Sequence, residues 1–530
     1  MPSYKVTRKK SDKPASESIY KKGISRLSEK LSDPIQSWKA YRKAKKTKNR
    51  PIRTQTGTRR NVGRTPVGGR RPPAPTARQT RRSASGRAGG VAPPAKTAAL
   101  YSRSRSQPGA MERNRQINFR NVRVAGSNAV LLLFLVSCFQ VMTTAQLLMR
   151  ADEEFTGDIL WVFALLLLVE WAYYIVMKIL FQRKTYELEA LAFFLSGVGL
   201  TVLAATQPKE LKTQFIALLI GVALYTVLVW FMKDVERMLI ARYIIGAGVL
   251  LIFVINLLIG RGPNGTRHWI YLGSFSIQPS EILKIGFIIA SVSTLERHQT
   301  AKNLGMFILY SLCCIGALVI MQDFGMALIY FTTFLIIAFI RSGDVRNIAL
   351  VTGGGIGAAV IAISFRPYIA DRFKAYGKVW EYADSLGYQQ TQTLIAAASG
   401  GLFGVGIGNG NLKYIAASNN DLVFGLLIEE WGLIFAALVV LAFCALVFYA
   451  MTCAPTARST FYSITACAAA GLLLFQTCLN IFGATDILPL TGVTLPFISK
   501  GGTSLMATWG LIAFIKAVDG RTYAKRGAIL

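Results

Sequence analysis

Three carboxylates lie close together in the segment from Asn419 to Trp431. Asp421 stands where a long polar loop passes into an apolar run, and Glu429 and Glu430 follow about two helical turns later. A charge near the centre of a membrane-spanning helix costs roughly 2.5–3.5 kcal/mol, so these acids require partners, a polar cavity or a chemical task. We expect Asp421 to lie at the outer surface, facing a polar cavity, where ionisation costs little. At least one of the glutamates is expected to be structural.

A second group of charges opens another apolar run. Glu281 follows Gln278-Pro-Ser280 and stands where a helix dipole favours an anion, while Ser280 or Gln278 can satisfy the first amides. Glu281 and Lys284 are three residues apart, so they share a helix face and can pair. Two interpretations remain open. The pair is either a structural ion pair or part of a polar cavity wall, with Lys284 available to a phosphate.

Arg267-His-Trp269 lies just upstream of that run. Arginine beside tryptophan is typical of an interfacial anchor, which the spacing favours. The alternative is a pyrophosphate ligand, because the guanidinium forks onto phosphate oxygens. The two histidines of the chain form no metal cluster and give little support to a histidine-based triad.

Glycines and prolines mark two further segments. Glycine recurs at 400, 401, 404, 406, 408 and 410, which disfavours an ordinary helix and predicts a tightly packed re-entrant loop. Leu488–Ser504 contains two prolines, paired glycines and several hydroxyl groups just before an apolar run. This composition suits an anionic or sugar ligand at a helix start, and the alternative is a reversal loop that only packs.

The elements that must position these residues are long apolar runs. Each is close to the length needed to cross about 30 Å of hydrocarbon, and the sequence predicts an all-α polytopic membrane protein with about twelve transmembrane helices. We place the spans at 127–148, 157–181, 186–205, 211–231, 237–260, 281–297, 303–321, 324–341, 346–365, 421–450, 459–483 and 501–519.

Charge sets the predicted orientation. With the N-terminus inside, every inner connection contains Lys or Arg, as the positive-inside rule requires. Both termini are then cytoplasmic, in a multi-pass protein of the cytoplasmic (inner) membrane. The polar segments gather on the outer side, and we expect them to form a cavity that opens outward. These segments are Gly260–Glu281, Gln322-Asp323, the 366–420 loop with Asp421, and Asp486–Ser504.

Basic residues are concentrated in the first part of the chain. The chain has 530 residues and a net charge of +33, and residues 1–123 hold 33 of its 60 Lys and Arg but only 5 of its 27 Asp and Glu. Few large apolar residues occur there, so a disordered cytoplasmic tail is expected. Two interpretations remain open: the tail binds anionic lipids or cytoplasmic cell-cycle proteins, or it is a solvated tether that fixes the orientation of the protein. Nucleic acid is not an expected partner.

Four parts are therefore expected along the chain. They are the tail at 1–123, N-terminal transmembrane helices at 124–260, a core at 261–520 that includes the loop 366–420, and a short cytoplasmic C-terminus at 521–530. The cysteines lie in or beside apolar runs and suggest no disulfide framework.

As a set, seven motifs in the core resemble those of the SEDS (shape, elongation, division and sporulation) family, the FtsW/RodA peptidoglycan polymerases. In chain order they are Arg267-His-Trp-Ile, Gln278-Pro-Ser-Glu281-x-x-Lys284, Gln322-Asp323-x-Gly325, Gly387-Tyr388-Gln389, Asp421-Leu-Val-Phe, Glu429-Glu430-x-Gly432 and Thr491-Gly-Val-x-Leu-Pro-Phe-Ile-Ser499-x-Gly-Gly-x-Ser504. The resemblance implies a SEDS-type core with two extra N-terminal helices.

The resemblance also implies an activity. Such an enzyme transfers a growing lipid-linked glycan to the GlcNAc 4-hydroxyl of lipid II and releases undecaprenyl pyrophosphate. Asp421 matches the essential loop aspartate, the candidate general base. The pyrophosphate needs a cation, which Lys284, Arg267, Arg372 or a divalent ion such as Mg²⁺ or Mn²⁺ could supply. No other cofactor and no metal ligand is assigned. The expected partners are lipid II, polyprenyl pyrophosphate and a class B penicillin-binding protein.

The candidate substrate-binding residues are Glu281, Lys284, Arg267, Trp269, Gln278, Asp323, Arg372, Gln389, Ser499, Lys500 and Ser504. The sequence departs from the family pattern in several places, among them the following two. The residues before Asp421 lack the usual Pro-Glu and His, and Lys500 stands where the family has a tyrosine. The alternative functions are a lipid II flippase or transporter, and an inactive scaffold of a cell-wall synthesis complex.

Overall fold

A computed structural model describes most of the chain after the basic tail. The described residues are 128–179, 185–262, 265–273, 275–296, 301–343, 345–346, 349, 352–355, 357 and 372–522. The predicted tail at 1–123 lies outside them, as does most of the predicted span at 346–365.

Helices make up most of the described structure and strands almost none of it, which confirms the predicted all-α class. They are α3 (Ala129–Leu148), α4 (Glu153–Ile179), α5 (Glu187–Thr206), α6 (Leu211–Phe231), α7 (Val235–Ile259), α8 (Pro279–Glu296), α9 (Ala301–Ile320), α10 (Phe324–Ser342), α13 (Tyr388–Gly400), α14 (Val423–Cys453), α15 (Thr460–Ala484) and α16 (Gly502–Val518). Apart from α13, each matches a predicted span to within a few residues. Nine helices among the described residues are long and apolar enough to cross a membrane.

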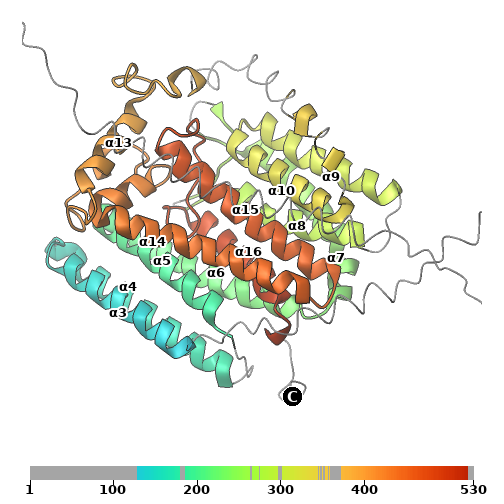
Figure 1. Cartoon of the computed structure of the whole chain (residues 1–530), viewed down its shortest axis with the longest axis horizontal. Helices are drawn as coiled ribbons and strands as arrows, with labels where there is room; N and C mark the ends of the chain where they lie inside the picture. Colours follow the sequence, from blue (N-terminus) through green and yellow to red (C-terminus); the bar gives the residue numbers. More distant parts are fainter. Residues whose placement is uncertain are drawn as a thin grey trace, which may run out of the picture. The chain divides into compact units, whose positions relative to one another are not determined.

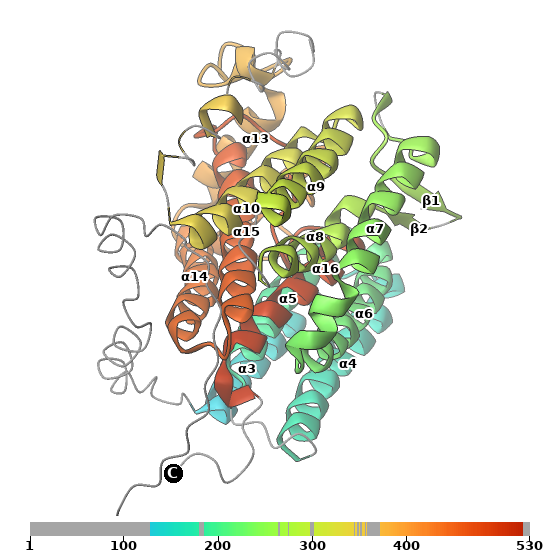
Figure 2. The same ribbon diagram turned by 90° about the vertical axis from the view of Figure 1, so that its right-hand side faces the viewer.

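Helices that are far apart in the sequence pack around α16. Helices α6, α8 and α15 contact α16, while α9 and α10 pack on one another and on α8. The hairpin of α3 and α4 lies at one edge of the bundle, next to α5, and α9 and α10 lie at the other (Figure 1). Helix α13 lies at one end of the bundle, beside the start of α14 (Figure 2).

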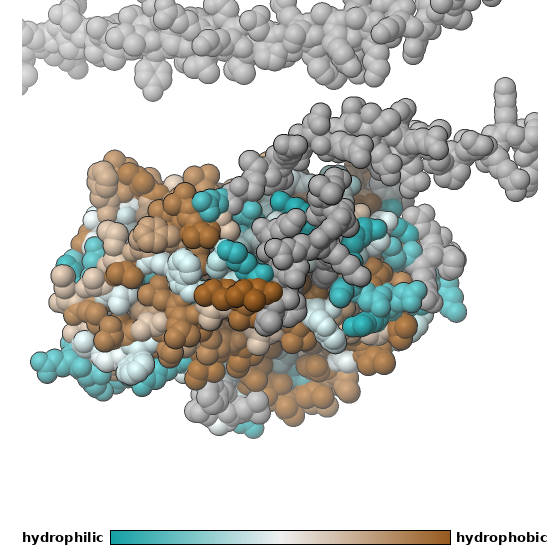
Figure 3. Space-filling view, turned by 90° about the horizontal axis from the view of Figure 1, so that it is seen from below, coloured by the Kyte–Doolittle hydropathy of each residue, from teal (hydrophilic) through white to brown (hydrophobic). Residues whose placement is uncertain are grey.

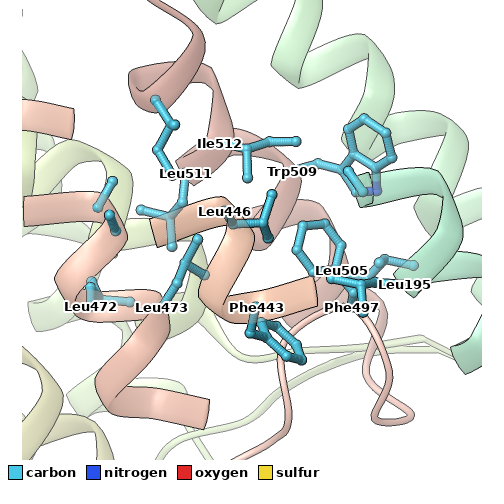
Figure 4. Close-up of a cluster of buried hydrophobic side chains, with 14 of the residues drawn as sticks. Leu195, Phe443, Leu446, Leu472, Leu473, Phe497, Leu505, Trp509, Leu511 and Ile512 are labelled. Carbon is cyan, nitrogen blue, oxygen red and sulfur yellow. The ribbon is translucent and has the colours of Figure 1, made fainter. Parts of the chain in front are cut away.

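Large apolar side chains fill the centre. Figure 4 shows side chains of α5, α14, α15 and α16 meeting there, with Phe497 from the loop before α16 among them. Trp509 is fully buried, and its ring stands edge-on to Phe193 with centroids 4.8 Å apart. This packing fixes the start of α16 and the loop that precedes it.

Apolar side chains also cover much of the outside. Leu131, Phe134 and Leu135 on α3 are each 55% exposed, and Trp161 on α4 is 69% exposed. Apolar residues make up much of the face in Figure 3, with hydrophilic residues at its edges and scattered among them. An exposed surface of this kind on long helices belongs to an integral membrane protein, because lipid rather than water is its solvent.

Two local features differ from the expected pattern. The predicted Gly260–Glu281 loop contains a short antiparallel hairpin, β1 (Ile270–Leu272) and β2 (Phe275–Ile277). The predicted span 421–450 is interrupted, because Gly432 has φ 83° and ψ 168° within α14. A Cβ at this position would lie 2.3 Å from the carbonyl oxygen of Leu402, so the break requires glycine.

Candidate active site

One cavity of about 1040 Å³ collects residues from all four predicted polar segments. Its wall is built from helix ends and the connections between them, together with side chains of α9, α10 and α15. The predicted convergence of these segments on a common cavity is therefore confirmed. Seven of the candidate residues line it: Trp269, Gln278, Asp323, Arg372, Asp421, Lys500 and Ser504.

Asp421 lies in the turn just before α14 and is held by its backbone. Its amide donates to the carbonyl of Ala417, and its own carbonyl accepts a hydrogen bond from the Asn480 side chain at 3.1 Å. Ala417 has φ 63°, which turns the chain sharply before Asp421. The carboxylate is thus presented to the cavity from a fixed turn.

The residues just before Asp421 are tied to the loop that precedes α16. Ser499 donates from its hydroxyl to the Asn420 carbonyl, and the Lys500 amide donates to the Asn419 carbonyl at 2.8 Å. The Asn419 side chain accepts a hydrogen bond from Thr206 at 2.7 Å. Ser499 is thus a support for the Asp421 turn and does not line the cavity.

Arg372 and Gly492 lie next to the Asp421 carboxylate. A Cβ built on Gly492 would be 3.5 Å from Asp421 Oδ2 and 3.7 Å from both terminal nitrogens of Arg372. Arg372 also donates to the carbonyl of Leu490 at 2.5 Å. The bare glycine therefore leaves open the space between a carboxylate and a guanidinium.

The environment of Asp421 corrects the expectation that its ionisation costs little. The side chain is half-buried. Burial raises the pKa of the carboxyl to about 6, although the positive charge of Arg372 opposes that rise. A carboxylate with a pKa close to the working pH is better matched to general-base catalysis than an ordinary aspartate.

Asp323 forms a second polar group on the cavity wall. Its carboxylate accepts hydrogen bonds from Gln278 at 3.0 Å, from Ser280 at 3.3 Å and from the Met326 amide at 3.2 Å. Gln278 and Ser280 thus bind Asp323, although we expected them to satisfy the first amides of α8. Burial raises the pKa of Asp323, and the nearby His268 opposes that rise.

His268 lines the same cavity and was not among the candidate residues. In the sequence, the two histidines fit neither a metal cluster nor a catalytic triad. The sequence feature that could have identified His268 as a site residue is its position between Arg267 and Trp269, shortly before the Gln278 motif.

Glu281 and Lys284 pair behind the cavity wall. The Lys284 ammonium is 2.5 Å from the Glu281 carboxylate, and both side chains are almost completely buried. Lys284 also donates to Gln476, which in turn donates to Thr494. Thr494 lines the cavity and donates to Glu281 at 3.3 Å. The predicted pairing is confirmed, and its geometry matches the structural interpretation of the pair.

Three more candidates do not direct a polar group into the cavity. Arg267 is exposed and donates to the Leu257 carbonyl at 3.1 Å. Gln389 donates to the Ala416 carbonyl at 3.0 Å and so braces the loop before Asp421. Lys500 lines the cavity, but its ammonium is 2.9 Å from Gln207 and 3.4 Å from Glu210.

The glycine-rich segment packs against the break in α14. Val405 and Gly406 donate their amides to the carbonyls of Glu429 and Glu430. The Glu429 carboxylate accepts from the amides of Asn411 and Leu412 at 2.8 and 3.0 Å. The predicted tight packing and the structural role of at least one glutamate are both confirmed.

Apolar side chains line the rest of the cavity. They come from α9, α10 and α15, and include Leu312, Ile315, Val319, Leu328, Phe331, Phe475 and Leu479. One part of the cavity thus offers carboxylate, guanidinium and imidazole groups, and another offers a hydrocarbon surface. No group of three or more metal-ligating side chains occurs among the described residues.

Comparison with known proteins identifies relatives of most of the chain. The FTSW_RODA_SPOVE family, described as "Cell cycle protein", matches residues 192–524. A protein named "Probable peptidoglycan glycosyltransferase FtsW" from Tolumonas auensis is 31% identical over 350 residues, which cover 62% of this chain and 90% of that protein. "Stage V sporulation protein E" from Bacillus subtilis is 32% identical over 263 residues, covering 48% and 72%.

A solved structure shares the fold. It is described as "Structural coordination of polymerization and crosslinking by a peptidoglycan synthase complex", and one of its chains aligns with a TM-score of 0.54 and 25% identity. The alignment covers 63% of this chain and 96% of that chain. The family match spans every residue that lines the cavity, whereas α3 and α4 lie outside it.

Proposed function

This chain belongs to the FtsW/RodA/SpoVE family, and on that premise we propose that its cavity is the active site of a peptidoglycan glycosyltransferase. The enzyme polymerises lipid II during cell-wall synthesis. The observation that carries the site assignment is the half-buried Asp421, held on a fixed turn in a cavity that joins charged groups to an apolar surface.

Asp421 is the general base in the proposed reaction. Its carboxylate takes the proton of the GlcNAc 4-hydroxyl of lipid II, and that oxygen bonds to C1 of the donor MurNAc. The bond from C1 to the diphosphate oxygen breaks, and its electron pair leaves with undecaprenyl pyrophosphate. Base catalysis of this kind typically contributes about 10²–10⁴ in rate.

Arg372 supplies positive charge close to the reacting atoms. Of the three cationic side chains considered from the sequence, it alone lines the cavity. Lys284 is sealed against Glu281, and Arg267 is turned to a backbone carbonyl. The Glu281–Lys284 pair supports the site through Thr494 and does not touch substrate.

The apolar part of the cavity suits the polyprenyl chains of the substrates. Side chains of α9, α10 and α15 provide a hydrocarbon surface next to the charged groups. Because such a chain already lies in lipid, the surface contributes packing contacts with it and little additional hydrophobic free energy. A lipid-linked sugar diphosphate has the same two-part character as the cavity.

The protein is placed in the cytoplasmic membrane with its cavity facing outward. The positive-inside distribution of Lys and Arg supports this orientation, with both termini in the cytoplasm. A class B penicillin-binding protein is the proposed partner, supported by the solved structure of a peptidoglycan synthase complex. Contacts of the basic tail with anionic lipids or cell-cycle proteins remain part of the proposal.

The test of the function is polymerisation of labelled lipid II by the purified protein with its cognate penicillin-binding protein in detergent. Detergent removes the membrane compartments, so a lipid II transporter yields no product there. We expect glycan chains that lysozyme digests. Absence of chains from a folded complex, together with lipid II translocation in vesicles, would instead support the transporter.

A further inference from the structure

We propose that His268 binds the diphosphate of a prenyl-linked substrate, with Asp323 as the residue that positions its imidazole. The inference rests on the proposed function and assigns a ligand to a side chain of the cavity wall. It names a substrate-binding residue for the diphosphate end of the substrate, separate from the Asp421 turn.

One polar atom of His268 has no partner in the protein. His268 lines the cavity and is half-buried, and its Nδ1 atom is buried without a hydrogen-bond partner. Asp323 lies close enough to interact with it electrostatically. Three donors already hold the Asp323 carboxylate in place. The imidazole therefore lies near the fixed Asp323 carboxyl group, and its Nδ1 lacks a hydrogen-bond partner.

The other cationic side chains on or near this wall already have partners in the protein. Lys500 is bound to Gln207 and Glu210, and Arg372 donates to a backbone carbonyl beside Asp421. Lys284 is fully buried against Glu281. Among the described lining residues, His268 is the remaining side chain that can gain a positive charge when an anion arrives.

The apolar residues extend from this same point. Leu312, Ile315 and Val319 follow one another at helical spacing on α9, and Asp323 comes directly after that helix. Phe324, Leu328 and Phe331 continue a matching stripe along α10. A polar head at the origin of two apolar stripes has the form of a prenyl diphosphate site, with the diphosphate at His268 and the chain along α9 and α10.

Binding of a diphosphate should change the protonation of His268. Burial lowers the pKa of this imidazole, while the charge of Asp323 raises it. A diphosphate adds negative charge and shifts the imidazole towards its charged form, which makes the stronger, charge-assisted hydrogen bond. Other titratable groups also surround His268. They are Glu281 behind Asp323, Arg267 next in sequence, and Arg372, Asp421 and Lys500, which line the same cavity.

Farnesyl diphosphate is a suitable probe for calorimetry on the purified full-length protein, with EDTA present to remove divalent ions. Titrations in buffers of different ionisation enthalpy measure the protons taken up. We expect the wild-type protein to bind with uptake of up to one proton. Its affinity should fall by up to tenfold per pH unit above the pKa of the free imidazole.

Two substitutions separate charge from structure. His268→Arg provides a fixed cation, so it should bind the probe at pH 8 at least as well as the wild type and take up no proton. His268→Gln should bind about tenfold more weakly at pH 6 and lose the proton uptake. Arg267→Gln, next in sequence but turned away, is the matched control and should behave like the wild type. Because the His268→Arg titration carries the pH dependence of the ligand itself, it corrects for that effect.

Wild-type affinity and proton uptake in His268→Gln would overturn the inference. If the wild-type protein polymerises lipid II and this result is obtained, only the role of His268 fails. If the wild-type protein forms no glycan under the conditions described above, the proposed function fails, whatever the binding data show.

Discussion

At the scale of single residues, Asp421 combines two properties that a base requires. It is ionised near neutral pH, and it is held by hydrogen bonds to its own backbone. Its type and place at the head of a helix could be recognised in the sequence. Its raised pKa could not, because burial comes from segments as distant as Arg372 and Gly492.

The first prediction concerns the pH dependence of polymerisation. The base must be ionised, and the pKa of Asp421 is raised to about 6. The rate should therefore be nearly constant above pH 7 and fall as pH is lowered through 6, approaching tenfold per unit. Initial rates with labelled lipid II between pH 4.5 and 8 measure this. A rate that stays constant down to pH 5 would contradict the environment assigned to Asp421.

A second residue-scale prediction separates the two members of the buried ion pair. Glu281→Gln leaves the Lys284 ammonium buried without its counter-charge, so it should destabilise the folded protein by about 3–5 kcal/mol. The double variant Glu281→Gln with Lys284→Met removes both charges and should recover most of that loss. Thermal unfolding in detergent tests this. Equal melting temperatures for the wild type and Glu281→Gln would exclude a structural role for the pair.

At the scale of elements, apolar runs predicted the helices well, because a segment that crosses lipid must be both apolar and helical. The break in α14 was not predicted. It depends on hydrogen bonds that the amides of Leu433 and Ile434 donate to the carbonyls of Gly401 and Leu402, which lie about 30 residues away in sequence. The hairpin of β1 and β2 was missed for a related reason, since two three-residue strands carry almost no pattern.

The glycine-rich segment provides a matched pair of substitutions. Gly404 and Gly408 have φ values of 80° and 76°, so alanine is strained to a similar degree at both. A Cβ on Gly404 would lie 2.3 Å from the Glu430 carbonyl oxygen, whereas a Cβ on Gly408 meets nothing within 4 Å. Gly404→Ala should therefore lower the melting temperature clearly more than Gly408→Ala. Equal losses would show that the contact with α14 contributes little.

At the scale of the whole molecule, the hairpin of α3 and α4, which lies outside the family match, is hydrogen-bonded to the glycine-rich segment that packs against α14. Arg150, at the tip between α3 and α4, donates to the Ile407 carbonyl at 3.1 Å and to the Asn409 side chain. A second link, between Lys212 and Asp158, is an exposed ion pair at 2.8 Å. Charged hydrogen bonds to backbone carbonyls contribute about 1.5–3 kcal/mol, and exposed ion pairs about 0–1 kcal/mol.

These two links predict different responses to substitution. Arg150→Gln should increase amide hydrogen exchange across residues 404–412 and lower the melting temperature by a few degrees. Lys212→Gln, which removes a cation from the same hairpin interface, should change neither by much. If the two variants show the same exchange in this segment, Arg150 does not hold the loop.

The central claim is most directly tested by the rate of glycan formation in Asp421→Asn. This variant keeps the size of the side chain and removes its basicity, and Asp384→Asn, an exposed aspartate that does not line the cavity, is the matched control. We predict that Asp421→Asn lowers the initial rate by about 10²–10⁴ while the protein remains folded, and that Asp384→Asn retains the wild-type rate. Undiminished glycan chains from a folded Asp421→Asn protein would contradict the account.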